Sequence, residues 1–169
     1  MPTSRTDMPA AFDERSLLTT MLGYARATAV AKCEGLAAEG ASAAPLPGSP
    51  LTTVGGIVNH LRWVEHWWFE VIFLGEPDVG PWTDDDPDRE LRLGAQLPLA
   101  EVIAEYEAAA ARHDAIIAAA GLDATAKHPI RDGTHVTLGW ILLHMIEETA
   151  RHNGHLDILR ELADGTTGS

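Results

Sequence analysis

Histidine and glutamate side chains recur at helical spacing near the end of the sequence, in a pattern suited to binding a metal ion. His144, Glu148 and His152 follow one another at intervals of four residues, and His155 comes three residues later. Residues three or four apart lie on the same side of an α-helix, so consecutive members of this series point into the same space. Imidazole nitrogens and carboxylate oxygens are ligands for zinc, iron and similar divalent metals. The series is therefore a candidate metal site.

A second helix is expected to complete this site. His60 lies at the margin of the apolar face that carries Ile57, when each residue is turned by about 100°. By the same rule His152 falls on the apolar face of its own helix and Glu148 at the border of that face. Burying a carboxylate there costs free energy unless it is paired, which supports a ligand role. We predict a divalent-metal site formed by His60, Glu148 and His152.

Other interpretations of these residues stay open at this stage. A histidine at a helix margin is commonly a hydrogen-bonded polar residue with no ligand, and Glu148 can pair with Arg151 three residues later. Spacing of four on one helix is a weak signal by itself. Trp63 and Trp67 follow His60 on the same predicted helix. They can line a pocket for an apolar substrate, or they can simply fill the core.

The elements that must position these side chains are four apolar, helically periodic stretches, separated by segments rich in proline and glycine. Their spacing predicts an all-α, up-down four-helix bundle. The bundle is expected to span 13–165, preceded by an extended or disordered segment, 1–12, and followed by a tail, 166–169. The four helices are expected at about 13–38, 53–74, 98–121 and 137–163.

Two connecting segments have features of their own. The segment 75–97 is crowded with Asp and Glu around Trp82, and we interpret it as a solvated crossover fixed by one tryptophan. The alternative is a lid over a pocket or a subunit contact. The segment 128–136, which contains the turn-forming pair Asp132-Gly133, is consistent with a small hairpin.

Composition restricts the class of protein. The chain has 169 residues, enough for one domain with its own core, and its formal charge is −13. Because binding to nucleic acid or to anionic lipid depends on clustered basic residues, neither partner is expected. No apolar run is long enough for a signal peptide or a membrane span. The single cysteine, Cys33, cannot form an internal disulfide, so we expect a cytoplasmic protein.

Two longer stretches, LTTVGGIVNHL at 51–61 and EETARHNGHLDILRE at 147–161, resemble the DUF664 branch of the DinB superfamily. With Asp13-Glu14-Arg15 and Asp164-Gly165, the resemblance covers nearly the whole chain. It implies a metal-binding four-helix bundle that is often dimeric. The family ligands are a histidine on the second helix and a His-x-x-x-His pair on the fourth. His60 and His152 match two of them, and Glu148 stands in place of the third.

The resemblance also implies roles for neighbouring residues and a choice of metal. Zinc is favoured, with nickel or iron as alternatives, because two histidines and one carboxylate suit several divalent ions. Glu148 and His152 are expected to be catalytic as well as ligands. His155 is a candidate to form a hydrogen bond to one of the metal ligands and so to orient it. His144 and Arg151 are weaker candidates for the same surroundings or for a substrate pocket.

Relatives of this kind are thiol S-transferases, so the resemblance implies transfer of a low-molecular-weight thiol to an electrophilic small molecule. Mycothiol is the expected thiol, because the excess of arginine over lysine is typical of GC-rich genomes. We expect a homodimer with these two substrates. Two alternatives stay open: a non-catalytic metal- or ligand-binding stress-response bundle, and another metal enzyme, such as a mycothiol-dependent isomerase or an iron oxygenase-like protein.

Overall fold

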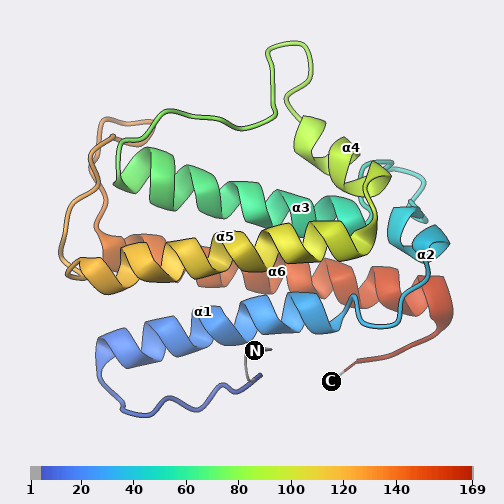
Figure 1. Cartoon of the computed structure of the whole chain (residues 1–169), viewed down its shortest axis with the longest axis horizontal. Coiled ribbons are helices and arrows are strands. Elements are labelled where there is room, and N and C mark those ends of the chain that lie inside the picture. The colour runs from blue at the N-terminus through green and yellow to red at the C-terminus, as the bar shows by residue number, and fades with distance from the viewer. Residues whose placement is uncertain (1–4, 169) are drawn as a thin grey trace.

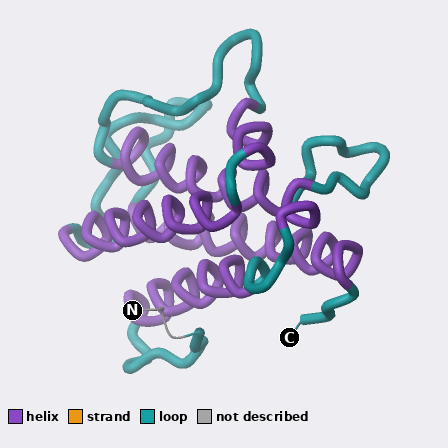
Figure 2. Tube along the Cα trace, turned by 45° about the vertical axis from the view of Figure 1, so that its right-hand side comes forward, coloured by secondary structure: helices purple, strands orange, loops and turns teal. Residues whose placement is uncertain are grey.

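The computed structural model describes residues 5–168 and consists of long helices lying side by side with shorter ones at one end (Figure 1). The predicted all-α bundle is confirmed. Figure 2 shows the helices as the body of the molecule and the loops joining their ends. Residues 1–4 and 169 of the predicted tails lie outside the described residues. The elements are α1 (Glu14–Ala31), α2 (Ala38–Ser42), α3 (Val54–Glu65), the π-helix η1 (His66–Phe73), α4 (Arg89–Gln96), α5 (Leu99–Ala119) and α6 (Leu138–Asp164).

Three of the long helices, α1, α3 and α6, begin where the sequence predicts, because the residue before each is a good N-cap. The side chains of Asp13, Thr53 and Thr137 each accept a hydrogen bond from the backbone N–H three residues later. Such bonds satisfy donors that a helix N-terminus otherwise leaves unpaired. At the other end of α6, Gly165 adopts a φ of 79°, a left-handed conformation that glycine reaches without strain.

The first helix is shorter than expected, and this part of the prediction was wrong. Helix α1 ends at Ala31 instead of near Ala38. The guanidinium of Arg160 donates hydrogen bonds to the carbonyl oxygens of Lys32 (3.0 Å) and Glu34 (2.7 Å), which stabilises a turn there. The short helix α2 then forms partly within the segment that its proline and glycine content had marked as a break.

The second long helix is continuous, but its second half is a π-helix, which the periodicity did not reveal. Helix α3 passes into η1 at His66, and the backbone N–H of Leu74 bonds to the carbonyl of Phe69, five residues back. π-Helical turns are uncommon and often occur near functional sites. Here η1 carries Glu70, whose carboxylate accepts one hydrogen bond from His113 Nε2 at 2.9 Å.

The acidic segment is only partly a loop, since its second half forms α4. Loop 75–88 is attached to the bundle by Trp82, whose ring packs edge-on against Trp63 and Trp67. The indole N–H of Trp82 donates to Asp78 at 2.8 Å. These contacts agree with a crossover fixed by one tryptophan. The expectation of an irregular segment up to residue 97 was wrong.

Helix α4 lies unusually close to α3, and two glycines make this possible. A Cβ atom on Gly55 would overlap the carbonyl oxygen of Gly94, and a Cβ atom on Gly94 would overlap that of Gly55. Asn59 on α3 also donates from its side-chain nitrogen to the carbonyl of Glu90 at 2.6 Å. Backbone contact and hydrogen bond together fix α4 against the second long helix.

The close approach gives a stability prediction. We expect Gly55→Ala to lower the free energy of unfolding by about 1–3 kcal/mol, because backbone atoms must move to admit the methyl group. Gly154→Ala is the matched control: a Cβ atom there meets nothing within 4 Å, and alanine favours a helix by about 1 kcal/mol. Urea denaturation of both variants checks this, and a neutral or stabilising Gly55→Ala would contradict it.

The segment 128–136, which was expected to form a hairpin, has backbone hydrogen bonds across a turn but no β-strands. Residue Ile130 donates to Thr134 at 2.8 Å around a turn at Gly133, where φ is 82°. Thr125 and Thr137 form an isolated β-bridge. Between residues 5 and 168 no strand forms, so the hairpin prediction was wrong beyond its turn.

None of the helices between residues 5 and 168 is long and apolar enough to span a membrane.

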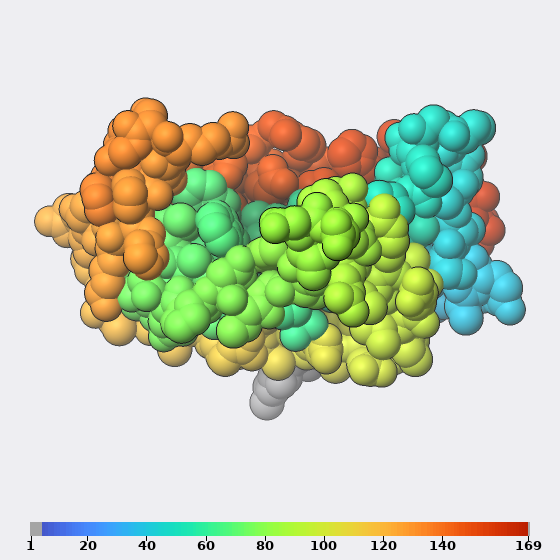
Figure 3. All heavy atoms as spheres, turned by 90° about the horizontal axis from the view of Figure 1, so that it is seen from above, coloured from blue at the N-terminus to red at the C-terminus, as the bar shows by residue number. Residues whose placement is uncertain are grey.

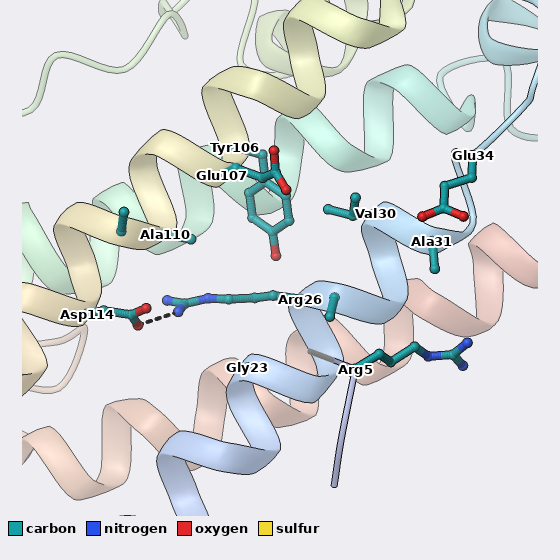
Figure 4. A pocket seen from close by; sticks show the side chains of 12 residues that line it. Arg5, Gly23, Arg26, Val30, Ala31, Glu34, Tyr106, Glu107, Ala110 and Asp114 are labelled. Atoms are coloured by element: carbon teal, nitrogen blue, oxygen red, sulfur yellow. Dashed lines mark hydrogen bonds and ion pairs between the residues drawn. The ribbon is translucent and has the colours of Figure 1, made fainter. Parts of the chain in front are cut away.

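A buried ionic network crosses the middle of the bundle and joins three of its helices. Arg26 of α1 donates two hydrogen bonds to Glu65 of α3, at 2.8 and 2.6 Å, and His113 of α5 contacts the same carboxylate at 2.9 Å. Arg26 also pairs with Asp114 at the edge of a cavity of about 380 Å³ between α1 and α5, into which Tyr106 points (Figure 4). The network ties α1 and α5 to α3.

Candidate metal centre

Three side chains from two helices converge at the boundary between α3 and α6. One ligand atom from each of His60, Glu148 and His152 lies within 4.8 Å of the other two. His60 Nε2 is 3.7 Å from Glu148 Oε1, and His152 Nε2 is 3.1 Å from the same oxygen. The two imidazole rings are 5.0 Å apart between centroids. Among the described residues this is the one group of His, Cys, Asp or Glu that meets this distance criterion.

The three side chains are enclosed but reachable from solvent. Their side-chain exposures are 23%, 17% and 16% for His60, Glu148 and His152. Figure 3 looks onto the side of the bundle where α4 and the preceding loop cover α3, and its surface is hollowed between these elements and α6. A site with this exposure can admit a small molecule, which a fully buried structural site cannot.

A fourth residue, Glu90, belongs to the same cluster, and reasoning from the sequence missed it. Its carboxylate Oε1 is 3.2 Å from His60 Nδ1, on the opposite side of the ring from Glu148. Glu90 is 6% exposed and lies in the first turn of α4. In the sequence it follows six other acidic residues of a segment that looks solvated, so no pattern distinguished it. Only the packing of α4 on α3 brings it to His60.

The electrostatics of the cluster follow from this crowding of opposite charges. Burial tends to lower the pKa of His60, but hydrogen bonds to Glu148 and Glu90 raise it to about 9. Hydrogen bonds from His152 and His60 hold the pKa of Glu148 well below its usual range. The cluster without an ion therefore holds positive charge between two carboxylates. A divalent cation would take the place of that charge.

His155, another histidine of the predicted set, contacts the ligand His152 but is not itself within the cluster. His155 Nδ1 is 3.3 Å from His152 Nδ1, on the side of the ring away from Glu148. His144, one of the reserve candidates, lies apart from the three ligands. Its ring packs against Trp68 and Trp140, with centroids 4.8 and 5.1 Å away.

The predicted tryptophans and arginine are placed around the site without joining the cluster. Trp63 and Trp67 form a group with Trp82 of the crossover loop. Arg151 is exposed and pairs with Glu147, while its other terminal nitrogen is 4.0 Å from Glu148. The alternative pairing of Glu148 with arginine is thus weak beside its contacts with the two histidines.

The donor set fits a divalent metal. Two imidazole nitrogens and one carboxylate oxygen make three ligands, which leaves coordination positions for water or a substrate. Each histidine has a hydrogen-bonding group at its other nitrogen, a common arrangement around metal ligands. Zinc, iron and nickel all accept such ligands, so the donor types alone do not select among them.

Comparison with known proteins adds a family to this geometry. The family model described as Mycothiol-S-transferase matches residues 17–165, which include α1 from its fourth residue onward, every later helix and the whole cluster. A search of the curated proteins gave no match. A match over this length identifies the family, and it agrees with the resemblance to DinB-like bundles seen in the sequence. The chain belongs to the mycothiol-S-transferase family.

Proposed function

We propose that this protein is a metal-dependent thiol S-transferase that conjugates mycothiol, or a similar low-molecular-weight thiol, to electrophilic small molecules. The observation that carries the proposal is the convergence of His60, Glu148 and His152, with ligand atoms within 4.8 Å, in a chain of this family. Three protein ligands with open positions are typical of catalytic rather than structural metal sites. The partly exposed cluster supports the same interpretation.

The chain's own residues would hold and orient the reacting groups. His60, Glu148 and His152 would bind the ion, which supplies a positive charge that lowers the pKa of a coordinated thiol and so yields a thiolate near neutral pH. The thiol proton would pass to solvent, the sulfur would form a bond to the electrophilic carbon, and the electron pair of the broken bond would depart with the leaving group. Cys33 does not serve as the nucleophile: it is 3% exposed, and burial raises its thiol pKa to about 12.

The electrophile would bind beside the aromatic group formed by Trp63, Trp67 and Trp82. Trp67 is 37% exposed, so this group offers aromatic surface to an apolar or aromatic substrate. Trp63 is three residues from His60, less than one helical turn along α3. The acidic loop 75–88 would thereby contribute to the substrate site through Trp82 while its charged residues remain solvated.

The proposal is tested by a conjugation assay. Purified protein, stripped of metal and then reloaded with zinc, nickel or iron, is incubated with mycothiol and a fluorogenic alkyl halide. We expect conjugate formation that depends on the metal and on the protein, with zinc most effective. Bacillithiol, glutathione and cysteine are the comparison thiols. No rate above background with any thiol and any metal would overturn the proposal.

Two outcomes point to the alternatives. Stoichiometric metal uptake without turnover would favour a non-catalytic metal-binding bundle. Because two histidines and one carboxylate also suit iron, an anaerobic iron titration with an oxygen-dependent spectral change would favour an iron enzyme. Homodimerisation and a cytoplasmic location remain predictions, and sedimentation equilibrium tests the first of them.

A further inference from the structure

We propose that Glu90 is a positioning residue for the metal centre: it accepts a hydrogen bond from Nδ1–H of His60 and so leaves Nε2 of that ring free to bind the ion. This inference rests on the proposed metal-dependent function. The geometry that carries it is the placement of the two ring nitrogens on different carboxylates, Nδ1 at 3.2 Å from Glu90 and Nε2 at 3.7 Å from Glu148.

The ring of His60 can serve as a ligand only in one protonation form and one orientation. A neutral imidazole carries its proton on one nitrogen and a lone pair on the other. A carboxylate at Nδ1 selects the form with the proton on that side and makes the opposite nitrogen more basic. Without Glu90 the ring could rotate or carry its proton on Nε2, which would place N–H where the ion must bind.

The fold holds Glu90 rigidly in this position. Its helix is fixed on α3 by the contact of Gly55 with Gly94, and Asn59 donates to the backbone carbonyl of Glu90 itself at 2.6 Å. Glu90 lies in the first turn of α4, where the helix dipole favours a negative charge. These contacts fix the backbone of Glu90 beside His60.

The burial of Glu90 is hard to explain without a role toward His60. Its Oε2 atom is buried and has no hydrogen-bond partner within the described part of the chain, and the same holds for Oδ1 of its neighbour Asn59. A buried carboxylate with one polar partner costs free energy. Glu65 differs, because Arg26 and His113 together satisfy both of its oxygens. Within residues 5–168, the imidazole of His60 is the one polar side chain that contacts the Glu90 carboxylate.

The two histidine ligands are supported unequally. His60 has a buried carboxylate at Nδ1, whereas His152 has the imidazole of His155, which is exposed. A carboxylate acceptor forms a stronger, charge-assisted bond than a neutral imidazole does. We therefore expect removal of Glu90 to weaken metal binding more than removal of the His155 ring.

The experiment measures zinc affinity by competition with a chromophoric chelator, and the visible spectrum of bound cobalt, in three Glu90 variants, in His155→Ala, in His152→Ala and in a surface control. We expect Glu90→Ala to weaken zinc binding about 10- to 100-fold and to change the cobalt spectrum, as loss of a ligand's hydrogen-bond partner does. Glu90→Asp and Glu90→Gln retain an acceptor and are expected to fall between Glu90→Ala and wild type. Asp85→Asn, which removes one exposed charge from the preceding loop, is the control and should match wild type.

Two results would overturn the assignment of Glu90. The first is wild-type zinc affinity in all Glu90 variants, while His152→Ala has lost the metal. The second concerns Glu90→Ala, with both losses expressed as free energies. If its loss of zinc-binding free energy is no larger than its loss of apo-protein unfolding free energy in urea, Glu90 is merely structural. If His152→Ala also keeps its metal at wild-type affinity, the metal centre itself is wrong, and with it the proposed function.

Discussion

His152→Ala is expected to purify without stoichiometric metal and to bind zinc more than about 100-fold more weakly than the wild type, because it loses a ligand and not only the support of one. His60 and Glu148 would remain, but two ligands hold an ion poorly. Elemental analysis of the purified protein measures occupancy, and chelator competition measures affinity. Zinc should also raise the Tm of the wild type and leave that of the variant unchanged, since binding to the folded state alone stabilises it.

The matched control is His144→Ala, which removes a histidine from the same helix two turns away. Its ring packs on Trp68 and Trp140 and lies outside the cluster, so metal content and affinity should stay at wild-type levels. Retention of one metal per chain by His152→Ala would place the site elsewhere. Loss of metal from His144→Ala instead would indicate that α6 presents a different set of ligands.

The starts of α1, α3 and α6 could be predicted from the sequence because their signals are local. Asp13, Thr53 and Thr137 are capping residues that act on their own helices, and apolar periodicity extends from each of them. The end of α1 could not be predicted, because it depends on Arg160, which is distant in the chain. Helix α4 was missed because it is short and polar on average, and because it directly follows an acidic run; its buried residues are Glu90 and Gly94.

The candidate ligands were predictable because family resemblance and spacing both selected His60, Glu148 and His152, and the structure brings all three together. Their role remains a prediction until metal is measured. The supporting residue Glu90 was not predictable, since a carboxylate in an acidic run looks solvated. The Arg26–Glu65–His113 network was missed for a related reason: charged residues on helices are usually exposed, and only the packing of three helices buries these.

That network provides the second large effect. Arg26→Met is expected to lower the free energy of unfolding at pH 7 by about 3–5 kcal/mol, the cost of leaving a buried ion without its partner. Glu65 is 1% exposed and would keep only His113 and a weak contact with Tyr106 at 3.5 Å. Because small domains are stable by about 5–15 kcal/mol, urea denaturation should show a clearly lower midpoint.

The dependence of this loss on pH separates an ionic cause from a change in packing. Burial alone would raise the pKa of Glu65, but Arg26 and His113 hold it at about 2, below its ordinary value of 4.5. A folded-state pKa below the unfolded value stabilises the protein above pH 4.5, and this stabilisation is lost as the pH falls toward 2. In Arg26→Met the buried carboxylate can take up a proton at low pH without losing a cation. The stability difference between wild type and variant should therefore shrink from pH 7 to pH 3.

Arg151→Ala is the control for removing an arginine that pairs with a carboxylate. Arg151 is exposed and pairs with Glu147 one turn away, so its loss should cost no more than about 0.5 kcal/mol at either pH. A loss of less than about 1 kcal/mol for Arg26→Met, far below the cost of breaking a buried pair, would contradict the account of the network. A large loss that stays constant from pH 7 to pH 3 would assign the effect to the packing of the Arg26 side chain between α1 and α5 rather than to its charge.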